Sequence, residues 1–226
     1  MSKSFDFVDE KIREADFFLD QLSESGMRMN QVRFHFNAFV SASRSITFSL
    51  QAVMNSTPGF REWYKPKQEA LKANETCQFF KTIRDQSLHI GSTPVNSGSM
   101  RTLENGDVEV KYWFKSDDPL IPLENAPEED VVTSCRSYLT TLIQLVYECY
   151  VEFGDIIDPR QYFSNESIAR RGWTPEHIEK YLGFPTGWSK TEGLSDSERI
   201  EALRKHIPDS LIDPIFVKYL GVPRPS

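Results

Sequence analysis

The sequence predicts a mainly α-helical protein, because four long segments repeat apolar residues at helical spacing. They cover approximately residues 5–23, 30–54, 74–90 and 130–157. An apolar stripe at every third or fourth position is typical of helices that pack into a bundle. An alternating pattern around residues 100–116 indicates a small β-hairpin, and short helices fill residues 159–226. We therefore expect a helical bundle over residues 1–158 with a hairpin insert, followed by a C-terminal helical appendage.

The first two helices are defined by their side-chain spacing. The first places four apolar side chains on one face, namely Ala15, Phe18, Leu19 and Leu22. The second has an apolar stripe from Phe36 to Val53, and the Pro58–Gly59 pair ends it. Beside that stripe lies a row of small residues, namely Ala38, Ala42, Ser45, Ser49 and Ala52. Small side chains at this spacing let a neighbouring helix approach closely, so we expect the second helix inside the bundle.

Residues 60–72 predict a further helix, which is rich in lysine and aromatic side chains. The next helix, over about 74–90, packs Phe79, Phe80 and Ile83 inward, and Asn74 is placed to cap its start. Basic side chains recur along these two segments.

The hairpin is predicted from strict alternation and from a turn signal. Four large apolar residues alternate with Glu, Lys and Trp, namely Val108, Val110, Tyr112 and Phe114. Asn105–Gly106 is a favoured hairpin turn. The long helix over about 130–157 follows, and Pro159 closes it.

The appendage contains two segments of the same design, Thr174–Pro185 and Asp213–Pro223. Each has a capping residue, proline at the first helical position, a short helix, a glycine stop and a final proline. The two segments are either a repeat or two independent solutions to helix capping, and the sequence leaves both open.

The composition limits the functional classes. Hydrophobic residues make up 39% and charged residues 26% of the 226 residues, and the net charge is −7. Any nucleic-acid site must therefore be a local basic patch. The three cysteines lack a Cys-x-x-Cys pair, and no metal-ligand cluster is visible, so we expect reduced core cysteines, no metal and no cofactor. No apolar leader or membrane span is apparent, which predicts a cytoplasmic protein.

Arg84 and His89 form the candidate catalytic pair, near the end of the helix over about 74–90. Arginine binds phosphate, and histidine transfers protons near neutral pH. The helix dipole and Asp85 both favour the imidazolium form of His89. Positions five apart on a helix diverge by about 140°, so one helix aims both side chains at one phosphate with difficulty. Two antiparallel copies in a homodimer could do so across a shared cleft.

The spacing of this pair has little weight by itself, because Arg171/His177 and Arg199/His206 have similar spacings. Arg171 and His177 straddle a helix start. Arg199 and His206 lie on a polar helix, which indicates a solvated face. Only the first pair lies at the end of a helix that packs aromatic residues inward. His35, His177 and His206 are expected to be structural.

A structural role for the first pair is the alternative that the residues leave open. In that case His89 would satisfy the last carbonyl groups of its helix, and Arg84 would pair with Asp85 or Glu75.

The run Arg84-Asp85-Gln86-Ser87-Leu88-His89 resembles the Arg-x(4–6)-His signature of the HEPN superfamily, although Asn is more usual than Asp after the arginine. The resemblance covers roughly residues 5–157, by helix order more than by residue identity. It implies a dimeric, metal-independent ribonuclease of the kind found in toxin–antitoxin, abortive-infection and other defence systems. Arg84 and His89 would then be the catalytic pair. Other members keep the fold and lack activity.

Five further residues are candidates for contacts with substrate, namely Asp85, Arg33, Asn37, Arg44 and Lys81. Basic residues interleaved with aromatic ones over residues 60–84 suit single-stranded RNA, which is bound by charge and stacking. An ordinary solvated helix face explains the same residues.

Three functions are consistent with these observations. The first is a HEPN-type endoribonuclease that cleaves RNA as a homodimer and has a cognate antitoxin or partner protein. The second is a non-catalytic dimer that binds a partner protein or a nucleotide. The third, a regulator whose C-terminal helices bind DNA, is disfavoured because residues 159–226 carry nearly equal numbers of acidic and basic residues.

Overall fold

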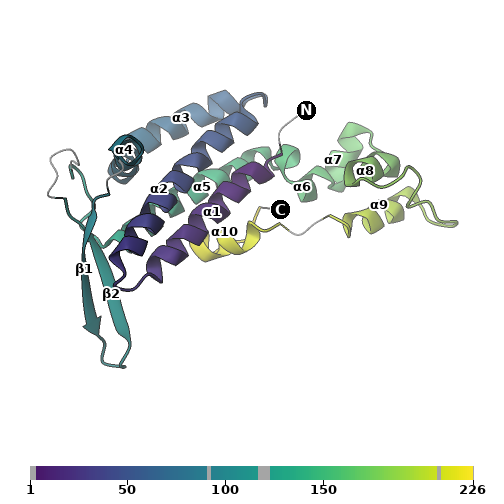
Figure 1. The fold of residues 1–226 in the computed structure, drawn as a ribbon. Coiled ribbons are helices and arrows are strands. Elements are labelled where there is room, and N and C mark those ends of the chain that lie inside the picture. The colour runs from purple at the N-terminus through teal and green to yellow at the C-terminus, as the bar shows by residue number, and fades with distance from the viewer. Residues whose placement is uncertain (1–3, 91–92, 117–122, 208–209, 226) are drawn as a thin grey trace. The chain divides into compact units, whose positions relative to one another are not determined.

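The computed structural model describes residues 4–90, 93–116, 123–207 and 210–225 (Figure 1). The described chain is mainly α-helical with one two-stranded sheet, as the sequence predicts. It divides into two compact units, Met1–Val146 with Lys218–Gly221 and Tyr147–Val217 with Val222–Ser226. The division lies within one long helix, whereas the sequence placed the domain boundary after residue 158.

The first unit contains α1 (Asp6–Ser23), α2 (Met29–Met54), α3 (Phe60–Ala73), α4 (Glu75–Ile90) and the start of α5 (Val131–Ile157). These bounds agree with the predicted ranges to within one or two residues. Helices α1 and α2 lie side by side (Figure 1) and bury their apolar stripes. The spacing of apolar residues therefore predicted the positions of these helices correctly.

An aromatic cluster joins three helices of this unit. The fully buried Phe80 ring of α4 stacks on Tyr138 of α5, with centroids 4.5 Å apart and an interplanar angle of 3°. The same ring contacts Phe36 and Phe39 of α2 at 6.3 and 6.2 Å. Aromatic pairs of this kind add about 0.5–1.5 kcal/mol beyond the area they bury. They hold the first half of α4 against α2 and α5.

The hairpin consists of β1 (Val95–Thr102) and β2 (Val108–Phe114), paired antiparallel. Gly106 has a positive φ of 87°, so the turn lies where the Asn105–Gly106 signal predicts it. Phe114 packs on Phe79 at 4.8 Å and on Phe36 at 5.9 Å. This contact anchors the hairpin to the bundle.

The second unit contains the end of α5, followed by short helices. They are α6 (Pro159–Tyr162), α7 (Asn165–Arg171), α8 (Pro175–Leu182), α9 (Asp196–Arg204) and most of α10 (Asp213–Leu220). Its core contains Phe163, Ile168, Ile178 and Leu203. The capping design read from the sequence explains α8, where Thr174 and His177 form a capping box and Gly183 adopts a φ of 81°.

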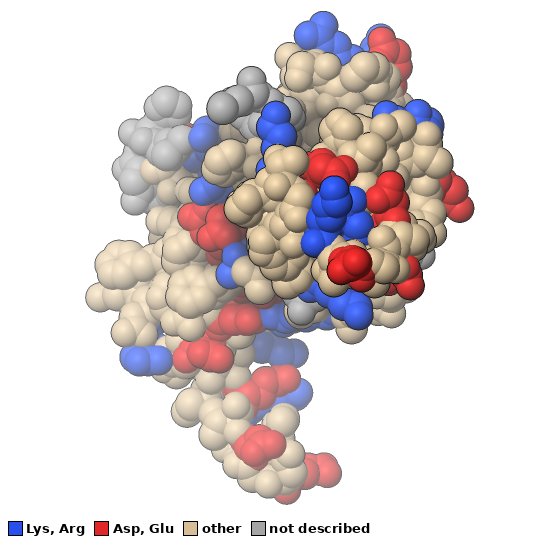
Figure 2. Space-filling model, turned by 90° about the vertical axis from the view of Figure 1, so that its right-hand side faces the viewer, with Lys and Arg blue, Asp and Glu red and all other residues tan. Residues whose placement is uncertain are grey.

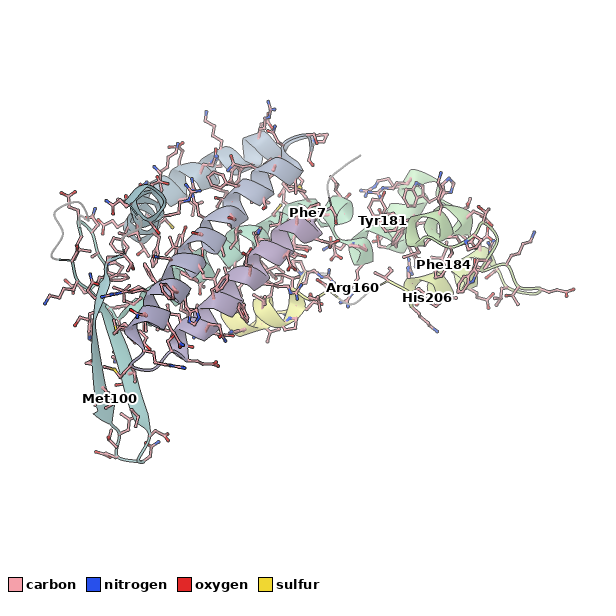
Figure 3. All side chains as sticks on the ribbon, viewed as in Figure 1. Phe7, Met100, Arg160, Tyr181, Phe184 and His206 are labelled. Atoms are coloured by element: carbon pink, nitrogen blue, oxygen red, sulfur yellow. The ribbon has the colours of Figure 1, made fainter. Side chains whose placement is uncertain are left out.

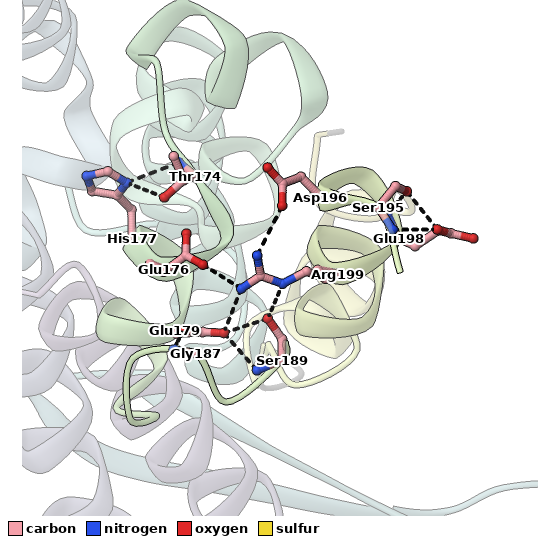
Figure 4. Close-up of polar contacts among 10 residues, drawn as sticks. All are labelled: Thr174, Glu176, His177, Glu179, Gly187, Ser189, Ser195, Asp196, Glu198 and Arg199. Carbon is pink, nitrogen blue, oxygen red and sulfur yellow. Dashed lines mark hydrogen bonds and ion pairs between the residues drawn. The ribbon is translucent and has the colours of Figure 1, made fainter. Parts of the chain in front are cut away.

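A buried ion-pair network crosses the second unit, and Figure 4 shows its members. Arg199 of α9 donates to Glu176 at 2.6 Å, to Asp196 at 3.0 Å and to Glu179 at 3.4 Å. Glu179 is fully buried and also accepts hydrogen bonds from the Ser189 backbone and hydroxyl. The predicted solvated position of Arg199 is wrong, since this residue is 6% exposed. The charged neighbours of Arg199 in the sequence indicated a solvated face, whereas two of its partners, Glu176 and Glu179, lie about 20 residues away on α8.

Candidate functional site

Arg84 lies on α4 and is half-buried, with 29% of its side chain exposed. Its Nη1 lies 3.1 Å from Oδ1 of Asp85, and its guanidinium carbon lies 5.9 Å from the centre of the Phe48 ring. The Asp85 carboxylate is half exposed, and ion pairs at such positions contribute little to stability. A phosphate could therefore compete with Asp85 for the guanidinium.

His89 lies in the last turn of α4, and its side chain lies outside the described residues. No distance between Arg84 and His89 is defined. Their pairing in one catalytic site stays a prediction.

Arg44 is a second guanidinium on the same aromatic ring. Its guanidinium carbon lies 4.5 Å from the Phe48 ring centre, and its Nη1 donates to Oγ1 of Thr47 at 3.1 Å. Because both guanidinium carbons lie near the centre of the same Phe48 ring, the distance between them cannot exceed the sum of 4.5 and 5.9 Å. Among the described residues, no carboxylate pairs with Arg44. Two cations thus share one ring that is 47% exposed.

A cavity of about 190 Å³ opens between α2, α3, α4 and α5, next to Arg44. Its floor is buried and its glutamine walls are half-buried, while two lysines stand exposed at its rim. None of the described residues that line it is an aspartate or a glutamate. The lining residues are Arg44, Thr47, Gln51, Tyr64, Gln68, Leu71, Lys72, Cys77, Gln78, Lys81, Tyr138 and Leu142.

Long hydrogen bonds connect the amides in this cavity. Gln68 Nε2 donates to Gln51 Oε1 at 3.4 Å, and Gln51 Nε2 donates to the Tyr64 hydroxyl at 3.5 Å. Bonds near the distance limit are weak. A ligand with its own donors and acceptors can therefore replace them at small cost.

Both titratable groups on the floor are neutral at pH 7. Burial raises the pKa of the Cys77 thiol to about 11, although nearby Arg44 lowers it in part. Burial also raises the pKa of the Tyr138 hydroxyl. The positive charge of the cavity is therefore not offset by a thiolate or a phenolate.

The predicted contact residues are only partly brought together. Arg44 and Lys81 line the cavity, and Asp85 lies beside Arg84. Arg33 instead donates to the Val95 carbonyl at 3.2 Å and to Asn96 Oδ1 at 2.6 Å, so it fastens the hairpin to α2. Asn37 has a buried Oδ1 with no hydrogen-bond partner among the described residues and does not line the cavity.

The other histidines make structural contacts where their side chains are described. His35 Nδ1 lies 3.0 Å from the Ser25 hydroxyl, and His177 caps α8. His206 packs edge-on against Phe184, with ring centres 5.3 Å apart (Figure 3).

A second cavity, of about 480 Å³, lies in the second unit and has three arginines in its lining. Arg160 pairs with Asp213, Arg170 with Asp155, and Arg224 with Asp158. Each guanidinium therefore already has a carboxylate partner. This cavity is larger than the first but is less suited to an anion.

Sequence reasoning missed most of the first cavity. Lys72 and Lys81 were visible in the basic stretch, but Gln68, Gln78 and Tyr138 come from three different helices. The helix packing that brings them together has no local sequence signal.

Charge is mixed elsewhere: on the face drawn in Figure 2, basic and acidic side chains are interspersed. No described helix is long and apolar enough to cross a membrane. Within the described ranges, no group of three or more His, Cys, Asp or Glu residues is placed to hold a metal ion. Comparisons with family models, with curated proteins and with solved structures give no match.

Proposed function

We propose that the protein is a metal-independent endoribonuclease of HEPN type, acting in the cytoplasm as a toxin or defence effector. The observation that carries the proposal is the group formed by Arg44, Phe48 and Arg84. It places two guanidinium groups on one exposed ring in a chain of net charge −7. This is the local basic patch that an acidic RNA-binding protein requires. Arg84 of this group lies on α4, the helix that also carries His89.

The chemistry uses the nucleophile that RNA itself supplies. The 2′-oxygen attacks the adjacent phosphorus, a bond from the 2′-oxygen to phosphorus forms, and the bond to the 5′-oxygen breaks. His89 moves the protons, taking one from the 2′-hydroxyl and delivering one to the leaving 5′-oxygen. Arg84 stabilises the charge on the phosphorane oxygens. The products are a 2′,3′-cyclic phosphate and a 5′-hydroxyl.

A homodimer is part of the same proposal, because two copies can bring two Arg84/His89 pairs to one cleft. The solvent-exposed side of α2 supports it. Ser41 and Ala52 on this side of α2 are exposed, and two phenylalanines of the helix, Phe34 and Phe48, are 67% and 47% exposed. A second copy packing there would cover apolar surface and lie close to Arg84.

Cleavage of purified total RNA, with and without EDTA, tests the proposal. We expect cleavage that EDTA does not inhibit, 2′,3′-cyclic phosphate ends, and resistance of 2′-deoxy substrates. His89→Ala should lower the rate by about 10²–10⁴-fold. Lys190→Gln, a surface change in the second unit, should leave it unchanged.

Three results would overturn the proposal. They are full activity of His89→Ala, cleavage of a fully 2′-deoxy substrate, and a strict monomer in light scattering at micromolar concentration. Dimerisation without any cleavage would instead favour the non-catalytic dimer that binds a partner protein or a nucleotide.

A further inference from the structure

We propose that the cavity between α2, α3, α4 and α5 holds one unstacked nucleotide of a single-stranded RNA, next to the phosphate bound by Arg84. This inference rests on the proposed ribonuclease function, since it names the part of the substrate that the cavity takes. It assigns a role to glutamine and tyrosine side chains outside the catalytic pair.

Charge is the first argument. Arg44, Lys72 and Lys81 line the cavity, and none of its described lining residues is a carboxylate, although Lys72 pairs with Glu69 outside the lining at 2.8 Å. Within the described ranges, Lys81 makes no ion pair, and Arg44 donates its one hydrogen bond to a neutral hydroxyl. A phosphate group is the biological anion that such a set of donors binds well, because charge-assisted hydrogen bonds are roughly twice as strong as neutral ones.

The walls and floor supply the second argument, because they match a nucleobase. Gln51, Gln68 and Gln78 present amides that can both donate and accept, as the edge of a base requires. Gln51 Nε2 also donates to the Thr47 carbonyl at 3.0 Å and Gln78 Nε2 to the Lys72 carbonyl at 2.7 Å, which leaves mainly their amide oxygens and Gln68 for the base. The hydroxyl of the buried Tyr138 adds another donor. Leu71 and Leu142 provide apolar surface for the face of the ring.

Size is the third argument. A volume of about 190 Å³ corresponds to about six water molecules at roughly 30 Å³ each. That space suits a single flipped-out base with part of its sugar, and it excludes a base pair. Sequence-specific RNA proteins typically bind unstacked bases of this kind.

Continuity with Arg84 is the fourth argument. Lys81 and Arg84 are three residues apart on α4, so they are neighbours on one helix face. Arg44 lines the cavity and contacts the same Phe48 ring as Arg84. An RNA strand whose base enters the cavity beside Lys81 therefore brings a phosphate, about one nucleotide along, next to Arg84.

Binding can be measured separately from cleavage. The probe is a set of 2′-O-methyl RNA oligonucleotides, which lack the nucleophile, titrated calorimetrically into the full-length protein. We expect Arg44→Gln and Lys81→Gln each to weaken binding about tenfold, and Arg44→Gln to lower the salt slope of log K by about 0.7. Arg13→Gln on α1 and Lys190→Gln are the matched controls. They should bind as the wild type does.

Base recognition has its own readout. Wild-type cleavage products should show a base preference at one position beside the cut, and Gln68→Leu should relax it with little change in the maximal rate. Among the described residues, the Gln68 side chain makes one hydrogen bond, the 3.4 Å bond to Gln51, so this variant should fold normally.

The two proposals fail in different ways. If His89→Ala abolishes cleavage while Arg44→Gln and Lys81→Gln bind and cleave normally, the nucleotide subsite is wrong and the ribonuclease stands. If those two variants weaken binding of the 2′-O-methyl probe but no RNA is cleaved, the subsite stands and the ribonuclease is wrong. Failure of the wild type to bind any probe overturns the subsite directly.

Discussion

Two arginines of the second unit and Arg44 of the first unit have opposite environments. In the second unit, Arg199 and Arg224 have only 7% and 6% of their side chains exposed, and each meets at least two carboxylates. In the first unit, Arg44 is half-buried beside a cavity and has a hydroxyl and an aromatic ring as its partners. A buried charge is tolerated when it is paired and fully hydrogen-bonded. Ion pairs with two or more carboxylates therefore mark an arginine that holds structure, and the lack of a carboxylate partner beside a cavity marks one that can bind an external anion.

The two cavities differ in the same way in how their arginines are paired. The cavity of the second unit has more than twice the volume of the first, yet its arginines are neutralised by Asp155, Asp158 and Asp213. The described residues that line the smaller cavity include three cations and no carboxylate. Charge compensation, rather than volume, therefore selects the candidate RNA site.

The largest expected effect comes from breaking the buried network. Arg199→Met leaves Glu179 buried without its cation, which should destabilise the second unit by about 3–5 kcal/mol. Hydrogen exchange of peptides from α8 and α9 in the intact protein measures this change. Arg170→Met, which removes an exposed ion pair of the same unit, should cost less than about 1 kcal/mol. Equal losses of stability in Arg199→Met and Arg170→Met would show that burial of the ion pair does not determine its contribution to stability.

Thiol chemistry tests the electrostatics of the first cavity. The thiolate is the reactive form, so a rise in the pKa of Cys77 from 9.0 to about 11 should slow its alkylation at pH 8 by about a hundredfold. Arg44→Gln should slow it further, because the lost positive charge raises the pKa again. Mass spectrometry of iodoacetamide-labelled peptides gives the rate. An unchanged rate in Arg44→Gln would show that Arg44 lies too far from Cys77 to lower the pKa of its thiol.

Low pH should lower the stability of the second unit more than that of the first unit. The Glu176 pKa is lowered from 4.5 to about 2 by hydrogen bonds from Arg199 and then Thr174. Burial alone would raise the pKa of Glu179, but hydrogen bonds from Ser189, Gly187 and Arg199 outweigh it and lower the pKa. A depressed folded-state pKa means that the stabilisation is complete above the unfolded value and is lost as pH falls through the folded one.

The expected window for this loss is therefore about pH 4.5 to 2, on the values for Glu176. Hydrogen exchange of α8 and α9 peptides across this range measures it. Glu176→Gln should flatten the profile, whereas Arg44→Gln, which has no carboxylate partner, should leave it unchanged. An identical acid profile for Glu176→Gln and wild type would contradict the role of the network.

The sequence predicted the elements well because their signals are local. The bundle helices were predicted to within one or two residues, since amphipathic spacing specifies both the helix and its buried face. The first strand begins at Val95, earlier than the predicted insert at about residue 100. Its small polar residues lack an alternating pattern, and pairing with β2 and contacts from Arg33 define the strand instead.

The environments of the site residues were harder to predict than the helices, because the residues that contact them are distant in the sequence. Arg199 was expected in solvent because Glu198 and Glu201 are its neighbours, but its orientation is set by Glu179 on another helix. Arg44 and Lys81 were identified as candidates from their charge alone. Their convergence with Gln68 depends on how α2, α3 and α4 pack, which no spacing rule describes.

The smallest expected effect tests the rule of charge compensation most directly. Lys72 stands at the rim of the first cavity, and Glu69 neutralises it through an exposed ion pair of 2.8 Å. Glu69→Gln removes that partner without altering the cavity, so binding of the 2′-O-methyl RNA probe should strengthen by about twofold. Lys72→Gln should weaken it by a similar factor, mainly through slower association. Stopped-flow titration at low salt resolves both changes. If Glu69→Gln leaves the affinity unchanged while Arg44→Gln lowers it, compensation at the rim has no effect, and only the cations inside the cavity bind the RNA.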